Sequence, residues 1–170
     1  MVQNILNWSK TILASSPVRW QYLIETYPLE LLSLPPAPNE WSALECLQHL
    51  VDVERTSTPV RIKTLLAGGS FPAFNPDADG SPDAPTIALA AEFARLRKEN
   101  LLLLEGVTEA DLVKEALHAE YGIVNLSQFL HHLAVHDLMH TVQAEQAMMQ
   151  PLIQGTGPWD VNYTAHIAKA

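Results

Sequence analysis

The sequence predicts an all-α protein, a four-helix bundle formed by a single domain over residues 1–170. Four long segments carry apolar residues at helical spacing, and no segment shows the alternating period of a strand. Apolar residues make up 48% of the chain and charged residues 17%, which excludes a disordered chain. A length of 170 residues fits one domain with a continuous core.

The first helical region covers residues 3–32 and contains a proline. Ser16-Pro17 resembles a helix start, with serine as the N-cap and proline at the first helical position. We therefore expect one stretch over residues 3–14 and a continuation or kinked second half over residues 17–32. The proline-rich segment that starts at Leu34 ends this region, because proline lacks the N–H that a helix requires.

The second helix begins after Ser42. Ser42 and Glu45 have the spacing of a capping box, in which each side chain satisfies a free backbone N–H of the other residue. Apolar residues continue at helical spacing to Ala67. Pro59 lies inside this segment and is expected to kink or break the helix.

The rest of the chain contains a long loop and two further helices. Residues 68–85 form the loop, in which Asp77-Ala-Asp79-Gly80 only faintly resembles a calcium-binding loop and lacks the glutamate that closes one. The third helix spans residues 85–105. A short helical turn near 108–111 and a loop at 118–122 follow, and the last helix runs over residues 126–150 before Pro151. The tail from residue 155 is expected to be punctuated by glycine and proline and then to form a short helical turn.

Charge and cysteine content exclude several classes of protein. The net charge of −9 repels phosphate backbones, so we expect no binding to nucleic acid. No apolar run approaches the length of a membrane span, and the N-terminal residues show no secretory signal. The only cysteine, Cys46, cannot form an intrachain disulfide and is expected to be a small buried residue. These features predict a cytoplasmic protein without a membrane partner.

The last helix carries an unusual set of histidines among core-type neighbours. His132, His136, His140 and Gln143 share one narrow stripe, because a helix advances about 100° per residue. Burying an imidazole without a partner is costly, whereas a metal ion satisfies two imidazoles at positions i and i+4 together. Two such pairs exist, His132/His136 and His136/His140, and the spacing alone does not choose between them.

A further histidine lies on a different helix. His49 follows the Ser42 cap by about two turns and sits beside Leu50 and Val53, so it too is expected to face the core. A histidine from one helix and a pair from another is a common way to build a metal site inside a bundle. Neutral imidazoles suit zinc, nickel, iron or copper, and three of them leave coordination positions open for water or substrate.

Several segments resemble a known family. The residues from Glu40 to Arg55 resemble the first signature of the DinB/YfiT-like superfamily, and those from His136 to Gln143 resemble the second. Tyr121-Gly122 before the last helix and Gly157-Pro158-Trp159 after it are also similar to the family. The resemblance extends over nearly the whole chain in the same order.

The resemblance implies more than the spacing does. It implies a four-helix bundle that assembles as a homodimer, and a divalent metal ion, zinc or nickel, held by His49, His136 and His140 rather than by His132. Family members with known activity include enzymes that act on low-molecular-weight thiols, namely bacillithiol transferases and a mycothiol-dependent isomerase.

Other polar residues are candidates for supporting roles. Gln143 is expected to position substrate or water, or to form a hydrogen bond within the bundle. Asp52 lies one turn after His49 and either orients a ligand or is an exposed aspartate. Tyr121 is expected to reach the site from its loop. Asp137 points away from the stripe and is expected to pair with another helix. The remaining histidines, His118, His131, His132 and His166, are expected to be structural or exposed.

These observations favour a metal-dependent enzyme with a small-molecule substrate. In the leading hypothesis a low-molecular-weight thiol binds the metal as a cosubstrate, and its sulfur attacks an electrophile, which makes the protein an S-transferase. The alternatives are a metal-dependent hydrolase that activates water, and a non-catalytic metal-binding protein of a stress response.

Overall fold

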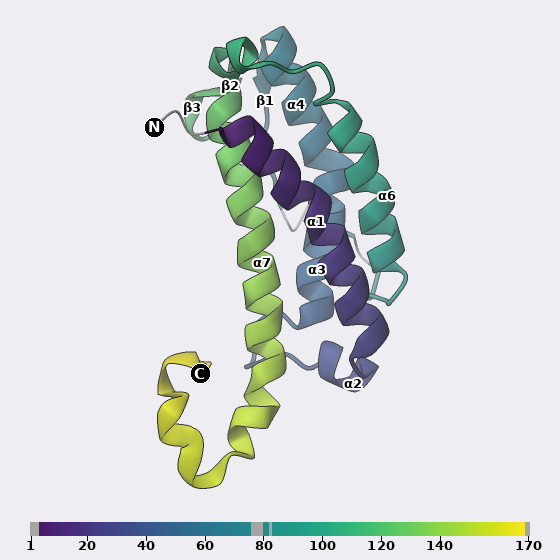
Figure 1. The fold of residues 1–170 in the computed structure, drawn as a ribbon, viewed down its shortest axis with the longest axis vertical. Helices are drawn as coiled ribbons and strands as arrows, with labels where there is room; N and C mark the ends of the chain where they lie inside the picture. Colours follow the sequence, from purple (N-terminus) through teal and green to yellow (C-terminus); the bar gives the residue numbers. More distant parts are fainter. Residues whose placement is uncertain (1–3, 76–79, 82, 169–170) are drawn as a thin grey trace.

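The computed structural model describes residues 4–75, 80–81 and 83–168, and it confirms the all-α four-helix bundle (Figure 1). The four long elements are α1 (Ile5–Thr26), the consecutive helices α3 (Ala43–Asp52) and α4 (Thr58–Ala67), α6 (Leu89–Leu102) and α7 (Leu126–Gln154). Both α1 and α3 pack against α6 and α7. Among the described residues, no helix is long and apolar enough to cross a membrane.

The predicted interruption at Ser16-Pro17 is wrong, because α1 continues through Pro17. Proline removes the N–H that would bond to the Leu13 carbonyl one turn earlier. Nη1 of Arg97 donates to that carbonyl at 3.0 Å instead, so the helix loses no buried hydrogen bond. The helix ends earlier than expected, at Thr26. Pro28 then precedes the short helix α2 (Leu29–Leu32).

The second helical segment follows its predicted start and break. The Ser42 N–H donates to Oε2 of Glu45 at 2.7 Å, and the Glu45 N–H donates to Oγ of Ser42 at 3.3 Å, which confirms the capping box. The break expected near Pro59 takes the form of a π-helix, η1 (Val53–Ser57), between α3 and α4. Pro59 lies in the first turn of α4, directly after the π-helix.

A small sheet was not predicted by the sequence. Strands β1 (Ser70–Phe71), β2 (Glu115–His118) and β3 (Gly122–Asn125) pair in that order, β1 with β2 in parallel and β2 with β3 antiparallel. The expected loop at 118–122 is thus a hairpin turn. The expected loop at 68–85 contains β1, and the Asp77-Ala-Asp79 string lies outside the described residues.

The strands of the small sheet precede α7 in the chain, and the tail follows it. A 3₁₀ turn, η2 (Glu109–Val113), confirms the predicted helical turn, and the sheet leads directly into α7. The last helix runs past Pro151 to Gln154. The tail contains η3 (Gly157–Asn162) and η4 (Thr164–His166), and it turns back toward α7 beyond the end of the bundle (Figure 1).

A buried ionic network ties the long helices together. Both terminal nitrogens of Arg97 donate to the Asp137 carboxylate, at 2.6 and 2.8 Å, and Nε lies 3.0 Å from Oε2 of Glu54. The Asn100 amide donates to Oε2 of Glu54 at 2.9 Å. The expectation that Asp137 pairs with another helix is confirmed. The histidines on either side of Asp137 are therefore held at a fixed rotation of α7.

Candidate metal centre

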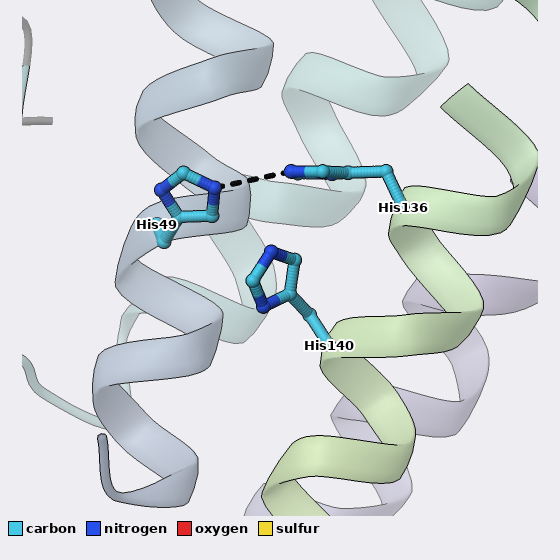
Figure 2. Close-up of side chains that lie close together, drawn as sticks. All are labelled: His49, His136 and His140. Atoms are coloured by element: carbon cyan, nitrogen blue, oxygen red, sulfur yellow. Dashed lines mark hydrogen bonds between the residues drawn. The ribbon is translucent and has the colours of Figure 1, made fainter. Parts of the chain in front are cut away.

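Three histidines converge between α3 and α7 (Figure 2). His49 comes from α3, and His136 and His140 lie one turn apart on α7. Each offers a ring nitrogen, and these three atoms all lie within 4.8 Å of one another. The Nε2 atoms of His49 and His136 are 3.1 Å apart. His132 is not part of this cluster: it is exposed, and its ring centroid lies 5.6 Å from that of His136.

Burial keeps these imidazoles neutral at physiological pH. Burial and the nearby His140 ring lower the pKa of His49 to about 4. Burial lowers the pKa of His136 to about 2, with further contributions from the adjacent imidazoles. The pKa of His140 is also lowered, chiefly by burial. A neutral imidazole has a lone pair available for a metal, so the site is already in its ligating protonation state.

The described residues meet only part of the hydrogen-bonding capacity of the cluster. Nε2 of His136 and Nε2 of His49 are in hydrogen-bond contact, and the buried Nδ1 of His136 has no hydrogen-bond partner among the described residues. Buried polar atoms are rarely left in this state. Two nitrogens bound to one tetrahedral ion at about 2.0–2.1 Å would lie roughly 3.3 Å apart. The observed 3.1 Å between His49 and His136 therefore fits a shared divalent ion.

Gln143 contacts the cluster directly. Nδ1 of His140 and Oε1 of Gln143 are 2.9 Å apart, across one turn of α7. An amide oxygen only accepts hydrogen bonds, so Nδ1 of His140 carries the proton and Nε2 keeps its lone pair. Gln143 was expected to position substrate or water, or to form a hydrogen bond within the bundle. The contact in the structure is a hydrogen bond to His140, which orients that imidazole.

Two aromatic rings cover part of the cluster. The Trp41 ring lies 5.0 Å from the His49 ring and stacks on His140 at 5.8 Å, measured between centroids. The Phe74 ring meets His49 edge-on at 5.4 Å. Neither ring was identified as a site residue from the sequence. Trp41 precedes the helix cap, and Phe74 lies in the loop after β1, so neither follows a helical period that leads to His49.

A cavity of about 410 Å³ opens beside the cluster. It lies between α4, the first half of α7 and the small sheet, and His49 and His136 form part of its wall. Much of the remaining wall is apolar, and the polar groups on it include Arg61, His118 and Glu120. A coordination position left open by His49 and His136 would therefore face a chamber large enough for a small organic molecule.

The hairpin between β2 and β3 contributes Tyr121 and His118 to this cavity. Tyr121 was expected to reach the site from its loop, and it lines the cavity while 71% of the residue is exposed. Its ring stacks on that of His118, with centroids 4.6 Å apart. His118, expected to be structural or exposed, is buried and also lines the cavity. The sequence could not reveal this, because the hairpin was not predicted.

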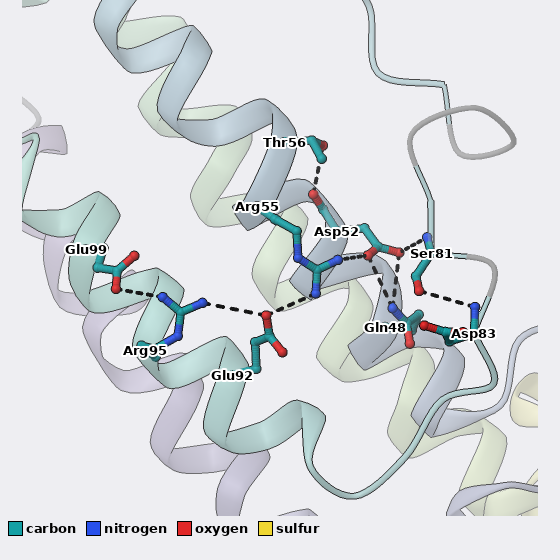
Figure 3. A network of polar contacts seen from close by, with 9 residues as sticks. All are labelled: Gln48, Asp52, Arg55, Thr56, Ser81, Asp83, Glu92, Arg95 and Glu99. Carbon is teal, nitrogen blue, oxygen red and sulfur yellow. Dashed lines mark hydrogen bonds and ion pairs between the residues drawn. The ribbon is translucent and has the colours of Figure 1, made fainter.

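Asp52 belongs to a separate polar network on α3 (Figure 3). Its buried carboxylate accepts hydrogen bonds from Nη1 of Arg55 at 2.8 Å, from the Ser81 N–H at 2.9 Å, and from the Gln48 amide. Arg55 in turn reaches Glu92 on α6 at 3.1 Å. No contact links Asp52 to a site histidine among the described residues. The network joins α3 to α6 and holds residue 81, so Asp52 supports the helix that carries the site.

Cys46 is not part of the histidine cluster. It lies one turn before His49 but is fully buried, which confirms the expectation of a small buried residue. Burial raises the pKa of its thiol to about 12. A protonated, buried thiol is a poor metal ligand and a poor nucleophile.

Comparisons with known proteins agree with the helical-bundle fold. A family model described as the DinB superfamily matches residues 12–144. Among solved structures, the chain is similar to YfiT from Bacillus subtilis, described as a probable metal-dependent hydrolase with an unusual four-helix bundle topology. The TM-score is 0.74 at 16% sequence identity, over 89% of this chain and 90% of that one. At this identity the likeness establishes the fold. No curated protein sequence matches the chain.

Proposed function

The chain belongs to the DinB superfamily, and on that premise we propose that it is a metal-dependent enzyme. His49, His136 and His140 hold one divalent ion, zinc or nickel. The observation that carries this proposal is the convergence of three neutral imidazoles from two helices, with two Nε2 atoms 3.1 Å apart. Gln143 orients His140, and Trp41 shields the cluster on one side.

The chemistry of the site follows from its ligands. An ion bound by three neutral imidazoles keeps its full positive charge and supplies a Lewis acid that lowers the pKa of a bound thiol or water. His49 and His136 present this position to the cavity, whose largely apolar walls favour a small organic substrate.

The leading function is S-transfer from a low-molecular-weight thiol. The thiol loses its proton to solvent, and its sulfur forms a bond to an electrophilic carbon of the second substrate. The bond from that carbon to the leaving group breaks, and the leaving group departs with the electron pair. Cys46 cannot supply the sulfur, because its thiol is buried and protonated. The thiol must therefore enter the cavity as a cosubstrate.

Hydrolysis is the second candidate, and Glu120 favours it. This carboxylate lines the same cavity as His49 and His136 and is able to accept a proton from an attacking water molecule. The water oxygen would bond to an acyl carbon while the alcohol or amine leaves with a proton. The description of YfiT as a probable hydrolase points in the same direction.

A cobalt-substituted protein separates these functions. Titration with bacillithiol, mycothiol and glutathione should produce a sulfur-to-cobalt charge-transfer band with at least one of them if S-transfer is correct. The absence of a band with all three, together with metal-dependent hydrolysis of a nitrophenyl ester, would favour the hydrolase. Metal uptake without either signal would favour the third possibility, a non-catalytic metal-binding protein of a stress response.

We also propose that two copies of the chain associate through α7. Its outer face carries four exposed apolar side chains in a row along the middle of the helix: Val135, Leu138, Met139 and Val142. Contiguous apolar surface of this kind is typical of a protein interface. Light scattering should give the mass of a dimer, and Leu138→Glu should shift it to that of the monomer. A monomeric wild-type protein would refute this assembly.

A further inference from the structure

Arg61 lines the cavity without an ion-pair partner among the described residues. Its Nε is buried and lacks a hydrogen-bond partner, and the guanidinium forms no ion pair among the described residues. Its carbon Cζ lies 5.7 Å from the centre of the Phe71 ring, so the group is packed rather than free in solvent. Burial lowers its pKa. Arg61 is half-buried, and holding an unpaired cation partly out of water is unfavourable, which points to a position suited to an anion.

The π-helix between α3 and α4 brings Arg61 to the cavity. Arg61 lies 12 residues after His49, and in an uninterrupted α-helix the two would point about 120° apart. A π-turn inserts one extra residue, so the remaining eleven steps return Arg61 to within roughly 20° of His49. The insertion thus places both residues on one face of the helix.

The neighbouring groups fit an anion as well. Nδ1 of His118 accepts hydrogen bonds from the backbone N–H groups of Glu120 and Tyr121, at 3.0 and 3.3 Å. Its Nε2 therefore carries the proton and is a hydrogen-bond donor. The positive charge of Arg61 contributes to the lowered pKa of His118, so the guanidinium is within electrostatic reach of that ring.

Glu120 is the carboxylate on the same wall, and it does not neutralise Arg61. No ion pair joins the two side chains among the described residues, and the charge of Glu120 acts instead on His118, whose pKa it tends to raise. The guanidinium fork of Arg61 is thus left for a ligand. A carboxylate matches this fork with two parallel hydrogen bonds.

We propose that Arg61 binds a carboxylate at one end of the substrate, while the other end of the same molecule reaches the metal centre. This proposal names the substrate class of the proposed enzyme. It rests on the proposed function only for the end of the substrate that reaches the metal. About 16–17 Å along the helix axis separates His49 from Arg61, and the arginine side chain leans back toward the start of the helix. The two ends of the substrate are therefore several bonds apart.

The walls between the two ends define the middle of the substrate. Val53, Phe71, Phe129 and Leu133 make this part of the cavity apolar. The substrate class is consequently an elongated organic acid with an apolar body, a carboxylate at one end and a sulfur or acyl group at the other. A small, compact acid would not reach both ends.

Binding to the metal-free protein tests the carboxylate site by itself. Calorimetry compares 4-phenylbutanoate with its neutral amide, which has nearly the same shape. The wild-type protein should bind the acid at least about tenfold more tightly, because a charge-assisted pair replaces a neutral hydrogen bond. Equal affinities for the acid and the amide would overturn the proposal without any variant being needed.

Variants then assign the preference to Arg61. In Arg61→Gln the acid and the amide should bind about equally, whereas Arg61→Lys should retain a preference for the acid. Lys63→Gln removes the same charge from an exposed position on α4 and should leave the preference unchanged. If Arg61→Gln kept the full preference for the acid over the amide, or if Lys63→Gln lost it, the preference could not be assigned to Arg61.

The same measurement separates this inference from the proposed function. A protein that takes up no metal but prefers the acid would refute the metal-dependent enzyme and support the carboxylate site. A protein that binds metal but shows no preference for the acid would refute the carboxylate site and leave the enzyme proposal intact.

Discussion

His140 and Gln143 form a hydrogen bond across one turn of α7, with 2.9 Å between Nδ1 and Oε1. The bond fixes both the rotation of the imidazole and the nitrogen that carries its proton. The ring nitrogen left unprotonated belongs to the cluster with His49 and His136. Gln143 is thus linked to the histidine cluster through His140.

Gln143→Ala should weaken metal binding by about tenfold to a hundredfold, because the His140 ring loses the group that orients it. Competition with a chromophoric chelator measures this affinity. Gln143→Glu, which keeps an acceptor oxygen, should recover most of it. Gln146→Ala, an exposed neighbour on the same helix, serves as the control. Unchanged affinity in Gln143→Ala would show that the hydrogen bond has no influence on the ligand.

Asp137→Ala should reduce the free energy of unfolding by about 3–5 kcal/mol, since Arg97 is left as a buried, partly unpaired cation. Urea denaturation followed by circular dichroism gives the value. The matched control is Glu145→Ala, which breaks a similar ion pair with Arg19 at the surface, 2.6 Å long, and should cost less than about 1 kcal/mol. Equal losses in the two variants would contradict the structural role of the buried network.

The metal-free protein should lose stability as the pH falls from about 6.5 toward 4. The pKa of His49 is lower in the folded protein than in the unfolded chain, so only the unfolded chain takes up this proton in that range. Stability should fall by roughly 1–3 kcal/mol and then become independent of this group below pH ~4. His49→Gln should flatten the slope. Urea melts across this range measure it, and an identical slope in the variant would rule out His49 as the source.

Cys46 should resist alkylation in the native protein. With a pKa of about 12, only about one thiol in ten thousand is ionised at pH ~8, and the side chain is buried as well. Mass spectrometry after treatment with iodoacetamide should find no adduct until guanidinium chloride unfolds the chain. Rapid modification of the folded protein would instead place a reactive thiol next to His49.

The bundle could be predicted from sequence because each long helix carries its own signals. The capping box of Ser42 and Glu45 and the helical spacing that follows it are local, and both are present in the structure. The sequence also predicted which residues share a face of α7, because His136 and His140 lie on one stripe of the helix and Asp137 does not. Convergence with His49 needed the resemblance to a family, since spacing within one helix carries no information about another.

Features that depend on distant residues were not predictable. The continuity of α1 through Pro17 requires Arg97, which lies 84 positions from the Leu13 carbonyl that it satisfies. Strands of two to four residues are too short to show a reliable alternation, so the hairpin that carries His118 was missed. The π-turn changes the helical phase by one residue, and for this reason no periodicity argument places Arg61 beside the site.

Metal affinity in single-histidine variants tests the central claim most directly. Wild-type protein and His132→Ala should each bind one equivalent of zinc or cobalt, whereas His49→Ala, His136→Ala and His140→Ala should each bind it at least about a hundredfold more weakly while remaining helical. His132 is the informative control, because sequence spacing alone allowed it to pair with His136. A wild-type protein that binds no metal, or a His49→Ala variant that binds it as tightly as wild type, would contradict the account.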